Sequence, residues 1–323
     1  IPLDDILADY TTAASHVIDG KVYYLDYGMM TGAVYYNKKL WAEAGLTDAD
    51  IPKTWDELAR VAQKLTKRDA NGNLTQAGFN FNNNGSFMLL DLYYQRGQNI
   101  FDASGKKATL NNEAGRANLQ MLKDLYDKYK VGDVHFGTDC VQSFGQGQSA
   151  MTYRWGNCVN DMKNNYPDIE YGTFEVPTVD GKTPYAYDRY NGESTMGINK
   201  NANAAQKEVA QDFLKFYLTN EDYLRAMCEQ NSVFPCYAPL QNDPELMASP
   251  AVSAVKEHID RYVWPGPMPA TLENNMKIAV EDVLYNGKDI SDTLQTAEDT
   301  INIDLANTNF VSAENKYKYY KAP

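Results

Sequence analysis

Three small residues near the middle of the chain have the spacing of a dinucleotide-binding loop. Gly145, Gly147 and Ala150 form the pattern G-x-G-x-x-A within the stretch FGQGQSAMTYRWGN. In a nicotinamide enzyme these glycines follow a strand and open a helix, so that the pyrophosphate meets the helix N-terminus. Here residues 138–146 predict a short helix before the glycines, and residues 149–155 predict a strand after them. The reversed order argues against a nicotinamide site.

Other catalytic patterns are incomplete. Gly192, Ser194 and Gly197 give G-x-S-x-x-G, whereas the nucleophile elbow of a serine hydrolase is G-x-S-x-G. The phosphate-binding pattern G-x-x-x-x-G-K-[ST] does not occur. A glycosidase needs only two carboxylates at a set separation in space, and the chain has 43 acidic residues. A glycoside-cleaving enzyme therefore remains an alternative.

The residue types that bind metals are dispersed. The three histidines are scattered and the four cysteines form no C-x-x-C pair, so we expect no metal site and no cofactor. Cys228 and Cys236 are close enough in sequence to form a disulfide. The other two cysteines are Cys140 and Cys158. Four cysteines allow three disulfide connectivities, however, and free buried thiols are equally consistent with the sequence.

Composition narrows the class of ligand. The formal net charge is −13 over 323 residues, and a field of that sign repels phosphate backbones, so nucleic acid is excluded as a partner. No run of 18 apolar residues occurs, so we expect no transmembrane segment. The 24 tyrosines combine an apolar face with a polar tip, which suits a surface that binds an amphipathic ligand such as a sugar.

The elements that would position such a surface alternate between strands and helices. Residues 21–27 and 32–37 are rich in Val and Tyr and predict strands. Helices are predicted after the capping box of Thr54 and Glu57, over 112–130, over 204–219, over 272–287 and from 290 onward. In the helix over 204–219, the buried face is predicted to carry Val209, Phe213 and Phe216. This order predicts an α/β chain, long enough for two domains.

Several segments, taken in order, resemble the extracellular solute-binding proteins of ABC importers, in particular the sugar and maltodextrin type. Residues 19–46 resemble that family's pattern of D-G-K, Y-Y-N-K and a closing A-G-L, and residues 52–66 resemble its P-x-T-W-[DE]-E-L helix. Residues 144–157 are similar to its F-x-x-G-x-x-A-M strand, 169–182 to its Y-G-…-P segment, and 197–221 to its long helix ending in F-L-x-[FY]-L-[TS].

The resemblance implies two α/β lobes with an interlobe ligand cleft, the type II periplasmic-binding-protein fold. Chain crossings near 26–28, 176–178 and 235–239 would place residues 1–27 and 178–237 in the first lobe. The second lobe would take 28–177 and 238–323. Family members begin with a signal peptide and a longer first-lobe segment, so we expect the first lobe to be incomplete here. A separate chain is one source of that missing segment, and the signal and lipid-anchor cysteine are expected to be absent from the sequence.

The same resemblance implies the ligand contacts. Sugar rings stack on aromatic faces, and their hydroxyls pair with polar side chains, so no catalytic residue is needed. Trp155 is expected to be the stacking platform. The other expected contacts lie on the crossings and on the ends of the cleft-lining elements: Tyr27, Met29, Asn84, Phe87, Arg154, Asn157, Tyr190, Asn191, Glu193 and Trp264.

The implied function is transport rather than catalysis. The chain would bind a carbohydrate, most simply an oligosaccharide, and deliver it to the permease subunits of an ABC importer. It would work on the extracellular face of a bacterial membrane, held by a lipid anchor, or in the periplasm. Besides a secreted glycosidase, the alternatives are a sugar sensor without a transport role and one half of an assembled receptor.

Overall fold

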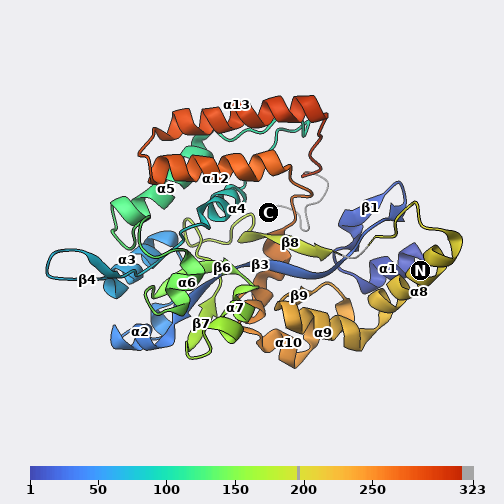
Figure 1. Cartoon of the computed structure of the whole chain (residues 1–323), viewed down its shortest axis with the longest axis horizontal. Coiled ribbons are helices and arrows are strands. Elements are labelled where there is room, and N and C mark those ends of the chain that lie inside the picture. Colours follow the sequence, from blue (N-terminus) through green and yellow to red (C-terminus); the bar gives the residue numbers. More distant parts are fainter. Residues whose placement is uncertain (195–196, 315–323) are drawn as a thin grey trace.

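The computed structural model of the chain describes residues 1–194 and 197–314, and its centre is one long strand (Figure 1). This strand, β3 (Asp26–Asn37), pairs with four others in the main sheet. The strands are β1 (Val17–Ile18), β2 (Lys21–Val22), β3, β4 (Lys67–Arg68), β5 (Leu74–Gln76), β6 (Met151–Trp155), β7 (Tyr171–Phe174), β8 (Asp188–Ser194), β9 (Phe234–Pro235) and β10 (Tyr262–Val263).

Helices surround this sheet. They are α1 (Leu3–Asp9), α2 (Lys38–Glu43), α3 (Trp55–Leu65), α4 (Gly85–Gln95), α5 (Glu113–Asp127), α6 (Cys140–Gly145), α7 (Cys158–Asn165), α8 (Ala204–Thr219), α9 (Glu221–Asn231), α10 (Pro244–Ala248), α11 (Pro250–Val255), α12 (Ala270–Leu284) and α13 (Ile290–Thr308). Short 3-10 turns lie at Ala13–His16, Asp48–Asp50, Ala238–Asn242 and Lys256–Arg261. In Figure 1, α1, α8 and α9 gather at the right-hand end of β3, and α2 and α3 at the left.

The two halves of β3 have different neighbours. Residues 26–31 pair with β8 on one edge and, at Gly28 and Met29, with β9 on the other. Residues 32–37 pair with β6 and β7. β3 therefore joins two sets of strands: β8 and β9 along its first half, and β6 and β7 along its second half.

Both faces of the second half of β3 are covered. Side chains on a strand alternate between its faces. Ala33 and Tyr35 pack into a cluster with Phe144 of α6 and Met162 of α7. Val34 points the other way, into the large core that includes α4 and α12. Burial on both faces explains why this strand is an almost continuous apolar run in the sequence.

Local sequence signals account for most helix ends. Thr54 accepts a hydrogen bond from the Glu57 amide while the Glu57 side chain accepts from the amide of Thr54, as the predicted capping box requires. The side chain of Asn112 caps α5, and that of Asp289 caps α13. The predicted short helix and strand around the glycines are confirmed as α6 and β6.

Two sequence predictions about these elements are wrong. The family resemblance implies a polar, glycine-containing loop over 188–194, but these residues form β8, because their backbone pairs with the first half of β3. The side chains of Val209, Phe213 and Phe216 are exposed by 70%, 44% and 44%, although the helix itself forms as predicted. The amphipathic pattern of α8 is present, but no described residue covers its apolar side.

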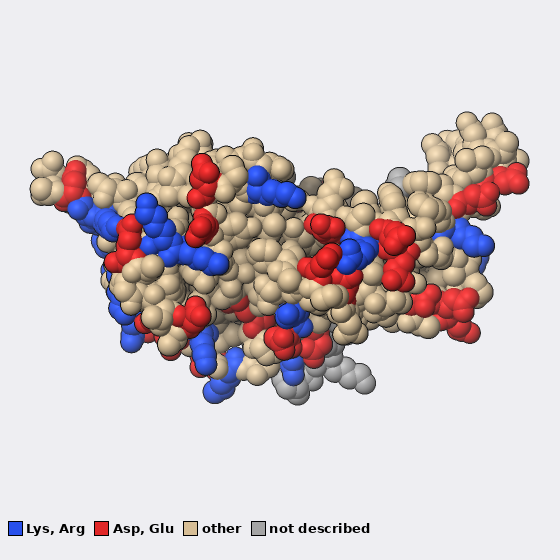
Figure 2. All heavy atoms as spheres, turned by 90° about the horizontal axis from the view of Figure 1, so that it is seen from below, with Lys and Arg blue, Asp and Glu red and all other residues tan. Residues whose placement is uncertain are grey.

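Charge is unevenly spread over the surface. On the face seen in Figure 2, acidic side chains gather toward the end of the molecule that carries α1, α8 and α9, and basic side chains are more frequent at the opposite end. Among the described residues, no helix is both long and apolar enough to cross a bilayer.

The side chains of Asp188 and Tyr153 lie so close to Gly32 that we expect any larger residue there to destabilise the fold. A Cβ atom there would lie 2.4 Å from Asp188 Oδ2 and from Tyr153 Oη, both buried. We expect Gly32→Ala to lower the free energy of unfolding by about 1–3 kcal/mol, because neither neighbour has room to withdraw. Urea denaturation measures the change. Gly197→Ala is the control, since nothing lies within 4 Å of its Cβ position; equal stability of both variants would contradict the prediction.

Candidate ligand-binding site

Trp155, at the end of β6, lies in a cluster of aromatic and charged side chains. Its ring and that of Phe87 on α4 meet edge to face, with 5.5 Å between centroids. The guanidinium of Arg189, on β8, lies 5.1 Å from the Trp155 ring centroid and 5.3 Å from that of Phe87. Trp155 and Phe87 are half-buried and so keep part of their rings accessible. The cluster combines two ring surfaces with a cation, which are groups that bind sugars.

The strand register explains why these residues meet. Trp155 is paired with Gly32 on one edge of β3, and Tyr190 is paired with Thr31 on the other. The Thr31 hydroxyl donates a hydrogen bond to the Arg189 carbonyl over 2.7 Å, which fixes β8 at this point. Trp155 and Arg189 therefore reach the middle of β3 from opposite edges.

Arg189 is buried, and its charge is balanced inside the protein. Its Nε donates to Asp91 Oδ1 over 2.8 Å, and its NH1 lies 3.9 Å from Oε1 of the half-exposed Glu273. A buried cation without such a partner would be strongly destabilising. The second terminal nitrogen, NH2, is buried and has no hydrogen-bond partner among the described residues.

Tyr153 connects the tryptophan to the charged groups. Its hydroxyl lies 2.7 Å from Asp91 Oδ2 and 2.8 Å from Asp188 Oδ2, and it accepts a hydrogen bond from Trp155 Nε1 over 3.0 Å. Burial, followed by the negative charge of the neighbouring aspartates, raises the pKa of Tyr153 well above its ordinary value. Tyr153 is therefore a neutral phenol that holds the indole in one orientation.

The arrangement suits binding rather than bond cleavage. Asp91 and Asp188, the two carboxylates that contact Tyr153, are both buried and engaged by Tyr153 and by backbone or guanidinium donors. Among the described residues no group of three or more His, Cys, Asp or Glu side chains could hold a metal ion. All four cysteines are free and buried, which decides between the two states left open by the sequence.

Arg154 lies on the opposite face of β6 from Trp155, because successive side chains alternate. It lines a polar hollow of about 410 Å³ with Asn82, Asn83 and Asp139. Its NH1 donates to Asn84 Oδ1 over 3.1 Å, and Asn84 Nδ2 donates to the Tyr153 carbonyl over 2.9 Å. The expected patch of Arg154, Trp155 and Asn157 is thus divided, because Arg154 and Trp155 lie on opposite faces of β6. Asn84, expected in another patch with Phe87, is buried.

Other expected contacts have buried side chains. Tyr27 packs edge-on against Tyr217 of α8, with 6.4 Å between ring centroids, and Met29 is buried next to it on β3. Tyr190 is buried on β8. Trp264 is buried with its ring centroid 4.4 Å from that of His16.

The remaining expected contacts lie nearer the surface. Asn157 is half-buried at the start of α7, and Asn191 is exposed on β8. The backbone of Glu193 pairs with Gly28, while its side chain lies outside the described part of the structure. Of all the expected residues, Trp155 and Phe87 are in direct ring contact; their role in binding remains a prediction.

The sequence analysis missed Asp91, Tyr153, Asp188 and Arg189. One signal was present: Asp91 interrupts the apolar run FMLLDLYY, where an acidic residue within a buried helix needs an internal partner. The partner itself lies almost 100 positions away, and no spacing rule connects the two.

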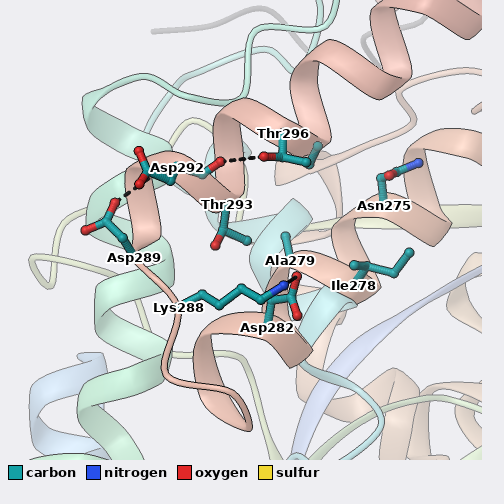
Figure 3. Close-up of a pocket in the computed structure, with 10 residues that line it drawn as sticks. Asn275, Ile278, Ala279, Asp282, Lys288, Asp289, Asp292, Thr293 and Thr296 are labelled. Carbon is teal, nitrogen blue, oxygen red and sulfur yellow. Dashed lines mark hydrogen bonds and ion pairs between the residues drawn. The ribbon is translucent and has the colours of Figure 1, made fainter.

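A separate hollow of about 310 Å³ lies between α12 and α13 and contains none of the expected contacts. Figure 3 shows Lys288 reaching Asp282 across it, with a distance of 2.9 Å between Nζ and Oδ2, while Asp289 and Asp292 lie at the start of α13. Its charged groups are largely paired with one another or with helix amides. The residues that line this hollow lie on α12, on α13 and between them, whereas Trp155, Phe87 and Arg189 lie on β6, α4 and β8.

Comparison with known proteins agrees with the architecture. Residues 1–223, more than two thirds of the chain, match the family described as bacterial extracellular solute-binding protein. The chain belongs to this family. This solute-binding protein spans about half the length of the curated relatives it matches, from 45% to 61%.

One such relative is the galactooligosaccharide-binding protein of Bacillus subtilis, 26% identical over 81% of the chain and 61% of the relative. Among solved structures, the maltose/maltodextrin-binding domain MalE of Bdellovibrio bacteriovorus, bound to maltotriose, has a TM-score of 0.76 at 21% identity, over 95% of this chain and 80% of that one. UgpB of Mycobacterium tuberculosis, in complex with glycerophosphocholine, has a TM-score of 0.75 at 18% identity, over 96% and 80%. The predicted two-lobe α/β fold is confirmed.

Replacing Tyr153 by Phe tests the connecting hydroxyl. The variant leaves Trp155 Nε1 without its acceptor and removes one partner from each aspartate, so we expect a loss of about 1–3 kcal/mol in the free energy of unfolding. Chemical denaturation measures it. Tyr171→Phe on β7 is the matched control, expected to change stability by less than about 0.5 kcal/mol. A Tyr153→Phe variant as stable as this control would mean that the hydroxyl is dispensable.

Proposed function

We propose that this solute-binding protein binds a carbohydrate, most simply an oligosaccharide, between its two lobes and delivers it to the permease of an ABC importer. The observation that carries the proposal is the Trp155–Phe87–Arg189 cluster. Its rings offer apolar surface to the C–H faces of a sugar, and the guanidinium of Arg189 lies beside both rings. The galactooligosaccharide-binding relative and the maltotriose-bound MalE neighbour support the same class of ligand.

The proposed site extends beyond this cluster to the interlobe cleft. We assign residues 1–27 and 178–237 to the first lobe, and 28–177 and 238–323 to the second. The change of partners along β3, between Thr31 and Gly32, supports a crossing within this strand. Closure of the lobes about such crossings would bury the ligand. Asn191, exposed on β8, and Asn157, next to Trp155, are the expected residues best placed to add hydroxyl contacts.

A further polypeptide segment is part of this proposal. Val209, Phe213 and Phe216 form an exposed apolar surface on α8, which a folded protein in water would normally cover. The difference in length between the chain and its relatives supports a first-lobe segment as the cover, on the same polypeptide or on a separate chain. The family works outside the cytoplasm; attachment of this protein by a lipid anchor is part of the proposal.

Binding is tested by calorimetry with a panel of galactose-, maltose-, mannose- and arabinose-based oligosaccharides. At least one should bind, and Trp155→Ala should weaken that binding about tenfold or more through loss of the stacking surface. Tyr23→Ala, which removes an exposed tyrosine outside the cluster, is the control.

Two results would redirect the proposal. Binding of glycerophosphocholine but of no sugar would change the ligand class. Cleavage products after long incubation with the oligosaccharides would identify a glycosidase, because a receptor returns its ligand intact.

Exposure of the α8 surface has its own test. Val209→Ser with Phe213→Ser should reduce the fluorescence of a dye that binds apolar surfaces, while the free energy of unfolding changes by less than about 0.5 kcal/mol. Ile303→Ser, at an exposed isoleucine on α13, is the control for a single exposed apolar side chain. A large loss of stability in the α8 variant would show that this surface is already buried in solution.

A further inference from the structure

The hydrogen bonds around Tyr153 require one more proton than the phenol can supply. Two carboxylate oxygens, Asp91 Oδ2 and Asp188 Oδ2, lie 2.7 and 2.8 Å from the same hydroxyl oxygen. A tyrosine hydroxyl has a single proton and can donate to only one of them. The other contact is a hydrogen bond only if that carboxyl group carries a proton and donates it; two unshared oxygens at this distance would repel.

The positions of the donors decide which aspartate is ionised. Asp91 Oδ1 accepts a charge-assisted hydrogen bond from Arg189 Nε, so its carboxylate form is stabilised. Asp188 Oδ1 accepts only from the Arg189 backbone amide, over 2.7 Å. The charge of one guanidinium balances one carboxylate, and a second buried carboxylate would remain uncompensated.

We propose that Asp188 is held in the folded protein as a neutral carboxylic acid, and that its proton positions Trp155 for ligand binding. Asp188 donates to Tyr153 Oη, Tyr153 donates to Asp91, and the remaining lone pair of Tyr153 accepts from Trp155 Nε1. Every donor and acceptor of the phenol is then used. The part that concerns the ligand rests on the proposed sugar-binding function.

The surroundings of Asp188 agree with this assignment. Burial raises the pKa of its carboxyl group well above the ordinary range, and the negative charge of Asp91 raises it further. Burial also raises the pKa of Asp91, but Arg189 opposes that rise. The titratable and charged groups that face Asp188 come from α4, β6, β8 and β10, and they are Asp91, Tyr153, Arg189 and Tyr262. Tyr94 and Glu273 face Arg189 instead.

The first test needs no ligand and compares the wild-type chain with Asp188→Asn. The amide of the variant can donate to Tyr153 and accept from the backbone, but it does not titrate. Because folding raises the pKa of Asp188, its stabilisation is complete below about pH 4, where an unfolded aspartate is also protonated, and declines as the pH rises toward the folded pKa. From about pH 5 up to the folded pKa of Asp188, the folding equilibrium constant of the wild type should fall relative to that of the variant, by as much as about tenfold per pH unit.

Parallel pH profiles of the two proteins would overturn the proposal, since they would mean that Asp188 is ionised when folded. Asp91→Asn is the matched control: it removes the counter-ion of Arg189 and should destabilise the chain at every pH. If Asp91→Asn is tolerated and Asp188→Asn is strongly destabilising, the proton belongs to Asp91 rather than to Asp188, and the assignment is overturned. Infrared spectra of the wild type give a measurement without variants, and the lack of a protonated carboxyl band at neutral pH would also overturn it.

The second test uses the sugar identified by calorimetry, over the range from pH 6 to alkaline pH. Each protein is compared with its own affinity at pH 6. As Asp188 ionises with rising pH, the wild type should lose about tenfold or more in affinity, while Asp188→Asn should keep its own value. Equal losses would overturn the positioning role. If no sugar binds either protein, the proposed function fails, whereas the comparison of stabilities still decides the protonation state.

Discussion

Gly32, in the middle of β3, has no side chain, and the polar network around Tyr153 depends on the space that this leaves. Gly32 leaves room for Asp188, from one edge of the strand, to meet Tyr153, from the other; any Cβ atom at Gly32 would collide with both. Backbone pairing brings the two neighbouring strands to the same point, because β6 and β8 lie on opposite edges of β3. Without this gap the two strands could pair with β3 but their polar side chains could not form hydrogen bonds across it.

Those hydrogen bonds give a polar centre within an otherwise apolar core. Arg189 and Asp91 compensate each other, Tyr153 links them to Trp155, and Asp188 completes the set. Such networks add less to stability than an apolar core of the same volume can, but they tolerate few alternative arrangements. Here the restriction acts on an indole ring whose outer part remains accessible. The rigidity of the proposed binding surface thus comes from buried groups that do not themselves reach the solvent.

The fold provides this surface but does not by itself identify the ligand. Neighbours with TM-scores of 0.76 and 0.75 are complexes with maltotriose and with glycerophosphocholine, respectively. Function in such folds depends on the groups placed in the site. The aromatic pair beside Arg189 favours a neutral sugar, because the surrounding acidic groups Asp91 and Glu273 already balance the guanidinium. The exposed apolar face of α8 belongs to the other end of the molecule, where a further segment is proposed to complete the first lobe.

The sequence by itself determined the local elements and the family. Capping residues, apolar periodicity and ordered motifs depend on neighbouring positions, so they predicted α3, α5, α6, β6 and the two-lobe fold, and they directed attention to Trp155 and Phe87. Tertiary structure alone decided what surrounds those rings. Asp91, Tyr153 and Arg189 come from a helix and two strands far apart in the chain, and only the register of the sheet brings them together. It also decided that Arg154 faces away from Trp155 and that the described residues leave the apolar stripe of α8 exposed, since periodicity shows which side of an element is apolar but not what packs against it.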